Sequence, residues 1–525
     1  MKIKHTMYLM VICIGVSGLV CACIPSPPAT PITDTPIPDT PVPEATPTKE
    51  APSQPRDSAG DEPEIAPSND SQLNETGPWL VYAAIDGIYA FNPDGSGFTK
   101  LDSIALDGLV VESITIAVPE KGSEIAVLRV DSQERLFLGM PRLRTFQLPN
   151  GALVYDSWLI PIDWNAEDYL TDGMSEQETK EHIEQIFAAI GLWNEIKWSH
   201  DGSMLAFNAA LDGPSADLYL YDSKSLEITR LTDGPSQSVH PEFTPDDEYI
   251  VHGAVESLNW GYSGAGYNYL NAWAAKTDDT NVIKLFDHEF YGWETVVGWL
   301  TDTEYLAASW ENWCYYFDLR VMDIFEGEQR NLYNGNFSTV AFGASPDKIF
   351  FTVPDFVEGG DCRVEFEHGA YLMDISDGEW VPLAGIDPEA VMTVSFNPAT
   401  NAFFASSMNG TLFRVQPNGQ VREYKTLDGY YETSISPDGE QWMFWDTFDD
   451  VATFGNSDGG YEQHTIEHPH SPAWLPDSSA VVFLGEQRGA PALYIAARPD
   501  MVPQALVTDI PAPYTNTMDL VLVNP

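Results

Sequence analysis

Basic side chains are scarce in this sequence. Its 525 residues include 25 lysines and arginines against 79 aspartates and glutamates, which gives a formal net charge of −54. Nucleic acids and anionic lipid head groups are bound through clustered basic side chains, so a surface this acidic repels both. We therefore expect no nucleic-acid partner. Solubility or a salty habitat explains the acidity, and cation binding is the alternative.

The N-terminal segment lacks a hydrophobic run long enough to cross a bilayer. Lys2 and Lys4 precede an apolar run, Met7–Val20. This run is shorter than a spanning helix, which takes about 20 residues. A basic start followed by a short apolar run is the pattern of a secretory signal, so we predict that the protein is exported.

Val20, Ala22 and Cys23 end this segment. They resemble the lipobox of bacterial lipoproteins, in which an aliphatic and a small residue stand three positions and one position before the lipidated cysteine. The resemblance implies that residues 1–22 are a signal peptide and that Cys23 is lipidated. It also implies an anchor to the outer face of a bacterial cell membrane, which the protein touches only through the lipid. An ordinary signal peptide without a lipid is the alternative.

Cysteine is nearly absent from the rest of the chain. Of five cysteines, Cys13, Cys21 and Cys23 belong to the leader, which leaves Cys314 and Cys362 for the mature body. Export to an oxidising compartment favours a disulfide between these two, and a pair of buried free thiols is the alternative. Two cysteines without a nearby histidine cluster do not make a zinc site.

Large apolar side chains are almost lacking from residues 23–78. Proline recurs there at short intervals, with threonine, alanine, aspartate and glutamate between. Such a segment cannot bury a core, so we predict a disordered, extended linker that acts as a stalk. The part of the chain that is able to fold is residues 79–525.

This body contains a recurring pattern of short apolar strands around a Pro/Ser-Asp-Gly turn. Clear copies are Ile196–Ala210, His240–Ala254, Thr433–Thr447 and Ser471–Glu486. Apolar residues spaced by two indicate strands and exclude a helical solenoid. Four short strands per unit, at a period of about 40–50 residues, are typical of β-propellers. We therefore predict an all-β fold, a single β-propeller of four-stranded blades.

The repeats resemble the TolB-type propeller repeat, which also forms the non-catalytic domain of the dipeptidyl peptidase and prolyl oligopeptidase families. The likeness rests on the Pro-Asp-Gly turn, the aromatic-rich strand after it, and segments such as Leu218–Asp222, Tyr371–Asp374 and Leu493–Ala496. It covers most of the body and implies the fold, but little about function. No hydrolase domain follows the repeats, so we do not expect a serine peptidase.

The number of blades is harder to read. The segment from Trp79 supplies second, third and fourth strands, and Met518–Val523 supplies a lone strand. Joined in one sheet, these two segments would close the ring and remove its exposed edges. Eight or nine units can be counted, and rings of more than eight blades are rare. We therefore predict eight blades, with seven as the alternative, and expect a misread unit near residues 110–160.

One short helical insertion, within residues 163–194, interrupts the strands. Ser175 and Glu178 have the spacing of a capping box, and apolar residues such as Ile183 and Ile186 share one helix face. We predict a helix that packs this face on the ring and covers an exposed edge. A lid that binds a partner is the alternative.

Signals of catalysis are weak. Residues 455–459 match Gly-x-Ser-x-Gly, but in a polar hairpin rather than in the strand–turn–helix that a nucleophile requires. Histidines are scattered, and no spacing collects His200, His240, His252, His288 and His368. Acidic loops such as Asp246–Glu248 lack the spacing of a calcium loop, so we interpret them as solvated turns. We predict no catalytic residues, no metal site and no cofactor, with calcium as the alternative.

Aromatic side chains gather in one glycine-rich insertion, which we expect to be a surface loop, at Trp260, Tyr262, Tyr267, Tyr269 and Trp273. They form our candidate ligand-binding surface, because aromatics stack on sugar rings and make protein hot spots; packing between blades is the alternative. The sequence thus favours a monomeric, surface-anchored, non-enzymatic binding or scaffold protein that recognises a protein, peptide or glycan. The alternative is an extracellular carbohydrate-active enzyme, a lyase or glycosidase on a propeller scaffold.

Overall fold

A computed structural model of the chain separates it into two units, and the larger consists of Ser68–Leu258 and Gly266–Pro525. The structure describes residues 72–103, 109–133, 140–160, 175–191, 195–212, 215–234, 236–261, 264–278, 282–284, 292–311, 316–343, 347–354, 367–426, 432–446, 450–514 and 520–525. The predicted lipidation site, Cys23, and the predicted disulfide partners, Cys314 and Cys362, lie outside these ranges. Lipidation and the disulfide therefore stay predictions.

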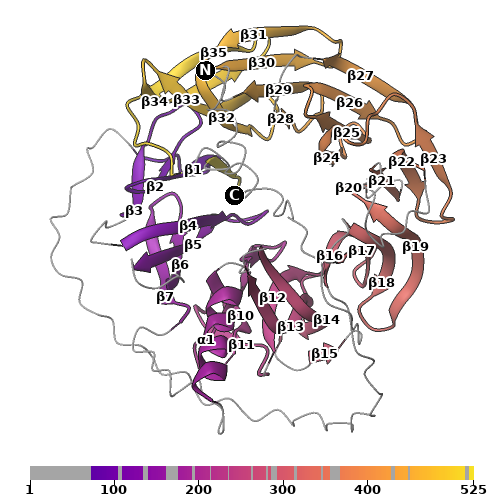
Figure 1. Cartoon of the computed structure of the whole chain (residues 1–525). Helices are drawn as coiled ribbons and strands as arrows, with labels where there is room; N and C mark the ends of the chain where they lie inside the picture. The colour runs from indigo at the N-terminus through magenta and orange to yellow at the C-terminus, as the bar shows by residue number, and fades with distance from the viewer. Residues whose placement is uncertain are drawn as a thin grey trace, which may run out of the picture. The chain divides into compact units, whose positions relative to one another are not determined.

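Nine four-stranded sheets follow one another around a ring, and we number them blade 1 to blade 9 (Figure 1). From the inner to the outer strand they are: blade 1, β36 (Leu520–Val523), β1 (Trp79–Ala84), β2 (Gly87–Phe91), β3 (Thr99–Ser103); blade 2, β4 (Leu109–Ala117), β5 (Glu124–Gln133), β6 (Met140–Gln147), β7 (Ala152–Trp158); blade 3, β8 (Lys197–Trp198), β9 (Met204–Ala209), β10 (Asp217–Asp222), β11 (Ile228–Arg230); blade 4, β12 (Gln237–Phe243), β13 (Tyr249–Gly261), β14 (Gly264–Lys276), β15 (Val282–Lys284); blade 5, β16 (Gly292–Trp299), β17 (Glu304–Glu311), β18 (Tyr316–Asp323), β19 (Gly327–Phe337); blade 6, β20 (Thr339–Gly343), β21 (Lys348–Val353), β22 (Gly369–Asp374), β23 (Trp380–Leu383); blade 7, β24 (Val391–Asn397), β25 (Ala402–Ser407), β26 (Thr411–Val415), β27 (Val421–Thr426); blade 8, β28 (Glu432–Ile435), β29 (Gln441–Asp446), β30 (Val451–Asn456), β31 (Tyr461–Thr465); blade 9, β32 (Glu467–Trp474), β33 (Ala480–Gln487), β34 (Ala490–Ala497), β35 (Val502–Thr508).

The predicted propeller of four-stranded blades is confirmed, but the predicted number of blades is wrong. The structure has nine, not eight or seven. The unit suspected of being misread is real, since β4 to β7 form a complete sheet of their own. Its first turn reads Pro119-Glu-Lys-Gly122, and this departure from Pro-Asp-Gly weakened the repeat signal there.

Blade 1 is built from both ends of the described chain, as predicted. β36 pairs antiparallel with β1, with Trp79 opposite Val523 and Tyr82 opposite Leu520. Figure 1 shows these indigo and yellow strands side by side. All four side chains are buried. The pairing gives β1 a partner on the side that would otherwise be an open edge, so the ring is closed.

The core consists of apolar layers between neighbouring blades. Each neighbouring pair shares a buried cluster among the described residues, including the pair formed by blades 9 and 1. Phe351 of blade 6, for example, lies against Tyr333 of blade 5, with ring centroids 5.3 Å apart. Because both faces of each sheet are covered, central strands such as β10 are apolar almost throughout.

The helical insertion is confirmed as α1 (Glu176–Gly191), between blades 2 and 3. The predicted capping box is present: the Ser175 amide donates to Glu178 Oε2 at 2.7 Å, and the Glu178 amide to Ser175 Oγ at 3.3 Å. Ile186 and Ile190 are buried in the cluster that joins blades 2 and 3. The helix contacts β6, β9 and β12 and therefore fills space between blades. Among the described residues, no helix is long and apolar enough to cross a membrane.

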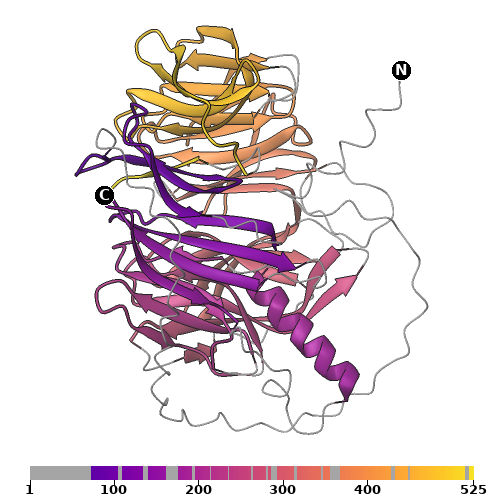
Figure 2. The same cartoon turned by 90° about the vertical axis from the view of Figure 1, so that its left-hand side faces the viewer.

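Antiparallel strands give the ring two distinct faces. Turns from first to second strands and from third to fourth strands lie on one face, which we call the turn face. The second-to-third turns and the connections between blades lie on the opposite, loop face. α1 is such a connection, and Figure 2 shows it at the right-hand side, the loop face. The helical insertion α1 therefore belongs to the loop face.

The acidic turns of the turn face bind the neighbouring blade. Asp247 of blade 4 accepts hydrogen bonds from the amides of His200 and Asp201 in the first turn of blade 3, at 2.9 and 3.0 Å. The amide of Asp438 in blade 8 donates to Ser478 Oγ in blade 9 at 3.0 Å. These carboxylates and amides join blades through their turns. The acidic loop of Asp247 is a turn, as predicted, but its carboxylate is mostly buried rather than solvated, with 12 % of the side chain exposed.

Candidate functional site

Four charged or titratable side chains meet where the inner strands of blades 3 and 4 adjoin. We call Glu195, Lys197, His240 and Glu242 the inner-edge cluster. His240 Nδ1 lies 3.2 Å from Glu195 Oε1, and Lys197 Nζ lies 3.4 Å from Glu242 Oε2 and 3.8 Å from Glu195 Oε2. The side chains are partly open to solvent, from 26 % for His240 to 52 % for Glu195. Solvent can therefore reach them.

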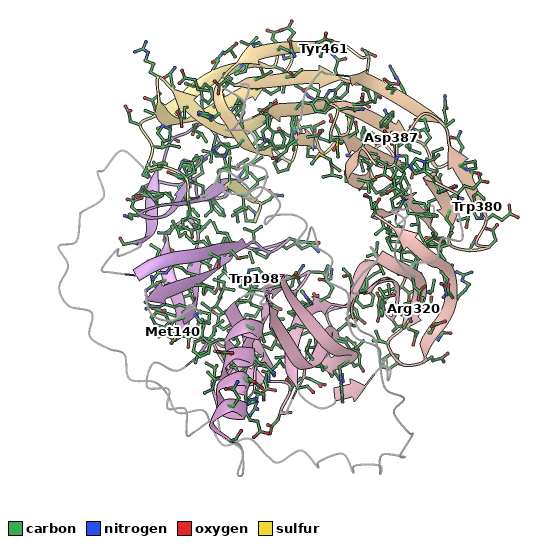
Figure 3. All side chains as sticks on the ribbon, in the orientation of Figure 1. Met140, Trp198, Arg320, Trp380, Asp387 and Tyr461 are labelled. Atoms are coloured by element: carbon green, nitrogen blue, oxygen red, sulfur yellow. The ribbon has the colours of Figure 1, made fainter. Side chains whose placement is uncertain are left out.

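Local structure explains why β8 presents Lys197 here. β8 is only two residues long, and Trp198 fixes it to blade 2, because its indole Nε1 donates to the carbonyl oxygen of Ala117 at 3.2 Å. Figure 3 shows Trp198 near the inner edge of the ring. Since Lys197 directly precedes Trp198, this bond holds the backbone from which the lysine extends.

β12 presents His240 through a bulge. The register between β12 and β13 shifts between Val239 and Glu242, and His240 has a φ of 51°. Pro241 follows it and has no amide hydrogen to donate to the ladder. A left-handed conformation costs a non-glycine residue about 1–2 kcal/mol. Backbone strain of this kind is often found at functional sites. The bulge also changes the direction in which the side chain points.

The electrostatics of the cluster favour an oriented histidine. The hydrogen bond with His240 lowers the pKa of the Glu195 carboxyl, and the charges of His240 and Lys197 act in the same direction. The contact of Glu195 Oε1 with Nδ1 orients the imidazole of His240. A histidine oriented by a carboxylate beside a lysine is a base next to a cation, which suits proton abstraction from an anionic substrate.

Other described histidines do not join this cluster. Burial lowers the pKa of His252 and His470 to about 4, so both are neutral at pH 7. His468 lies 3.6 Å from Asp450 in blades 9 and 8, and His368 lies 3.7 Å from Glu389. Each is a separate pair. In the part of the chain that the structure describes, no three His, Cys, Asp or Glu side chains gather closely enough to hold a metal ion.

The candidate aromatic surface is largely beyond what the structure describes. Tyr262 and the side chains of Trp260, Tyr267 and Tyr269 lie outside the described part. Trp273 is partly buried on β14, opposite Lys284. The glycine-rich segment was expected to be a surface loop, but β13 extends to Gly261 and β14 begins at Gly264, so most of it belongs to the strands of a hairpin.

Sequence reasoning missed the inner-edge cluster. His240 was among the scattered histidines, but Glu195 and Lys197 carried no signal, because some forty residues separate them from His240. Only the repeat could have brought them together. Each lies at or just before the first strand of its unit, and first strands of consecutive units adjoin in a propeller.

Comparisons with known proteins point to enzymes. No family model matches the chain. An oligogalacturonate lyase of Dickeya dadantii is 25 % identical over 366 residues, which cover 58 % of this chain and 89 % of the lyase. An oligogalacturonide lyase of Pectobacterium atrosepticum is 25 % identical over 373 residues, which cover 58 % and 88 %. The prediction of a non-enzymatic protein is therefore contradicted, since both relatives are named as lyases.

Solved structures with similar folds include an oligogalacturonate lyase in complex with manganese. It is 16 % identical, covers 72 % of this chain and 98 % of its own, and has a TM-score of 0.37. Prolyl endopeptidases, whose family the repeats resemble, give 13 % identity, coverage of 74 % and 55 %, and a TM-score of 0.39.

Proposed function

We propose that this chain is a carbohydrate-active enzyme, a lyase that cleaves an acidic oligosaccharide of the oligogalacturonate type. The observation that carries the proposal is the sequence likeness to two lyases, which extends over almost nine-tenths of each relative. The inner-edge cluster supplies the two groups that such a reaction needs from the protein, a base and a cation. It also lies at the inner edge of the ring, where side chains of neighbouring blades adjoin.

Elimination from a uronate assigns a role to each group. A base removes the proton on the carbon next to the carboxylate, and the electron pair forms a carbon–carbon double bond. The bond from the next carbon to the glycosidic oxygen breaks, and that oxygen leaves with a proton from solvent. We assign the base to His240 and the cation that stabilises the substrate carboxylate to Lys197. Glu195 is a positioning residue, because it acts through His240.

The proposal assigns no role to a metal ion. One lyase of similar fold is in complex with manganese. The described residues provide no group of three metal-binding side chains, and the inner-edge cluster offers one imidazole and two carboxylates that face a lysine. These residues do not fit a metal, so no step is assigned to one.

Substitutions in the cluster test the proposal. Lys197→Met and His240→Gln should each lower kcat/KM on oligogalacturonate by about 100-fold or more, the usual contribution of a positioned acid–base group. Glu195→Gln should lower kcat and alter its pH profile while KM stays unchanged. The measurement is the ultraviolet absorbance of the unsaturated uronate product.

Lys276→Met is the matched control for Lys197→Met. Lys276 is also ion-paired, to Asp278 at 2.8 Å, but it lies at the end of β14. This control should keep the wild-type rate. Wild-type protein inactive on acidic oligosaccharides would contradict the function, whereas full activity in Lys197→Met and His240→Gln would contradict the assignment of the site.

We also propose that the enzyme acts outside the cell, as a monomer tethered through Cys23 and the stalk of residues 23–78. The support is the pattern of the N-terminal segment, a basic start and short apolar run that end in a lipobox-like sequence. The partner of the body is then a glycan rather than a nucleic acid.

A further inference from the structure

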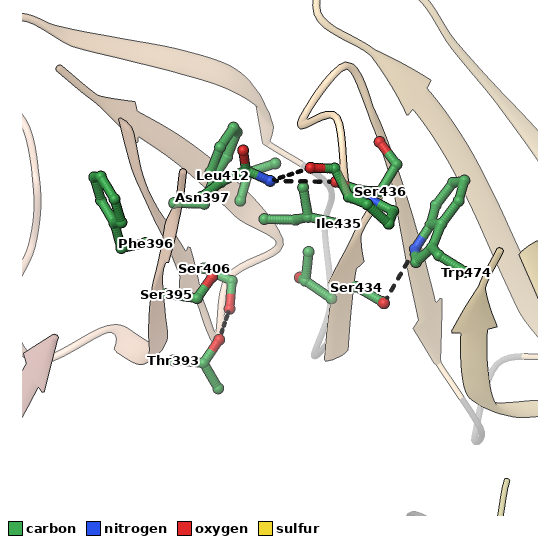
Figure 4. Close-up of a pocket in the computed structure, with 13 residues that line it drawn as sticks. Thr393, Ser395, Phe396, Asn397, Ser406, Leu412, Ser434, Ile435, Ser436 and Trp474 are labelled. Carbon is green, nitrogen blue, oxygen red and sulfur yellow. Dashed lines mark hydrogen bonds between the residues drawn. The ribbon is translucent and has the colours of Figure 1, made fainter. Parts of the chain in front are cut away.

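A cavity of about 380 Å³ lies between the inner strands of blades 7 and 8, far along the ring from the inner-edge cluster of blades 3 and 4 (Figure 4). Small-molecule sites have volumes of roughly 300–1,000 Å³, so this one suits a compact ligand. Its walls come from β24, β25, β26 and β28, and Trp474 of β32 closes one side.

Hydroxyl groups dominate the wall. Six serine and threonine side chains line the cavity: Thr393, Ser395 and Ser406 from blade 7, and Thr433, Ser434 and Ser436 from blade 8. No lysine, arginine, histidine, aspartate or glutamate is among its lining residues. Hydroxyls both donate and accept hydrogen bonds, so the wall matches a ligand whose own groups do the same.

Hydrogen bonds within the wall hold it in place. Thr393 Oγ1 and Ser406 Oγ are 2.6 Å apart, and the indole Nε1 of Trp474 donates to Ser434 Oγ at 3.1 Å. The Asn397 amide nitrogen donates across the blade boundary to the carbonyl oxygen of Pro437 at 3.0 Å. Figure 4 shows these bonds on both sides of the cavity. The site is therefore preformed, which lowers the cost of binding.

One hydroxyl group of the wall lacks a hydrogen-bond partner. Thr433 Oγ1 is inaccessible to solvent and has no hydrogen-bond partner within the protein. A buried polar atom without a partner costs about 1–3 kcal/mol. Thr433 lines the cavity, and a rotation about its Cα–Cβ bond that turned Oγ1 toward a ligand hydroxyl would recover part of that cost. Aromatic rings, those of Phe396, Phe404 and Trp474, supply the apolar surface that the carbon face of a sugar ring contacts.

We propose that this cavity is a binding site for a neutral polyhydroxylated ligand, a single sugar unit or a polyol. An anion would find no basic side chain in a protein with a formal charge of −54, and a cation would find no carboxylate. A purely apolar ligand would leave Thr433 Oγ1 without a hydrogen-bond partner. The proposal is independent of the lyase function, because none of the inner-edge residues lines the cavity.

Calorimetric titration of the full chain with galactose, xylose and glycerol tests this site. Wild-type protein should bind at least one of these neutral probes saturably. Thr433→Val, which removes one hydroxyl and keeps the shape, should weaken binding roughly fivefold, the effect of losing one hydrogen bond. Ser395→Leu, at an exposed position of the mouth, should abolish binding by filling it, and thermal melting shows that each variant is folded.

Thr453→Val is the matched control, since Thr453 Oγ1 is also buried without a partner but belongs to β30, outside the cavity. It should bind as wild type does. Absence of binding to every neutral probe would overturn the proposal, as would equal weakening by Thr433→Val and Thr453→Val. Binding that Lys197→Met removes would also overturn it, because the ligand would then occupy the inner-edge cluster. Loss of lyase activity with sugar binding intact would affect only the proposed function.

Discussion

Histidines of one chain acquire different properties from where each lies on its strand. His240 is partly exposed beside Glu195, whereas His252 and His470 are buried, and burial lowers their pKa to about 4. Residue type alone gives no hint of this division. The sequence shows the position of each histidine along the chain. Which of them is exposed depends on the sheet face on which it lies and on the bulge at Pro241.

Stability should fall between pH 6.5 and 4 because of the two buried histidines. In the unfolded chain they take up protons below about pH 6.5, whereas in the fold they stay neutral down to about pH 4. Unfolding then binds protons, so the free energy of unfolding declines as the pH falls through this window. His252→Gln and His470→Gln should each flatten the decline, by up to about 1.4 kcal/mol per pH unit. Urea unfolding at pH 7 and pH 5 measures it.

His368→Gln serves as control, since His368 lies in an exposed pair with Glu389. Asp217 acts in the opposite sense, because burial raises its pKa to about 6 and its contribution is lost as the pH rises through that value. It is common to all variants and cancels when they are compared. An unchanged slope in both histidine variants would contradict the account of their burial.

At the scale of elements, most local patterns and the closure of the ring could be predicted from the sequence. The capping box of Ser175 and Glu178, the Pro-Asp-Gly turns and the pairing of the two terminal strands were predicted correctly. Blade 2 was suspected of being misread because its first turn lacks Pro-Asp-Gly, and because rings of more than eight blades were held to be rare. The hairpin of β13 and β14 was mistaken for a loop, since its glycines have low strand propensity, which tertiary pairing overrides.

Closure of the ring should depend on β36. Val523 is fully buried between blades, opposite Trp79, so Val523→Asp places an unpaired carboxylate in an apolar layer. We expect a loss of more than about 3 kcal/mol in the free energy of unfolding, or failure to fold. Val502 is also a valine, but it lies on the outer strand β35 and is 46 % exposed. Val502→Asp should therefore leave the free energy of unfolding nearly unchanged. Equal effects of the two changes in chemical denaturation would contradict closure through β36.

At the scale of the molecule, nine covered sheets bring residues that are distant in sequence to one inner edge. The sequence predicted this ring and gave no means to predict the inner-edge cluster, because side chains from two consecutive units meet only once the blades are packed. The two alternatives for the function were ranked wrongly for the same reason. With no cluster visible, a binding protein was preferred to the carbohydrate-active enzyme that the relatives support.

The N-terminal segment allows a separate test of where the molecule acts. If Cys23 carries the lipid, the full-length protein expressed in a bacterial host should incorporate labelled palmitate and remain with the membrane fraction. Cys23→Ser should lose the label and be released. Equal labelling of wild type and variant would contradict the anchor, without bearing on the fold of the body.

The central claim is cleavage of an acidic oligosaccharide by elimination, and the masses of the products test it most directly. Purified protein is incubated with a defined oligogalacturonate, and the fragments are weighed by mass spectrometry. Elimination predicts two fragments whose masses add up to that of the substrate, one of them unsaturated. Fragments that together carry one additional water would show hydrolysis, and an intact substrate would show no cleavage; either result would contradict the claim.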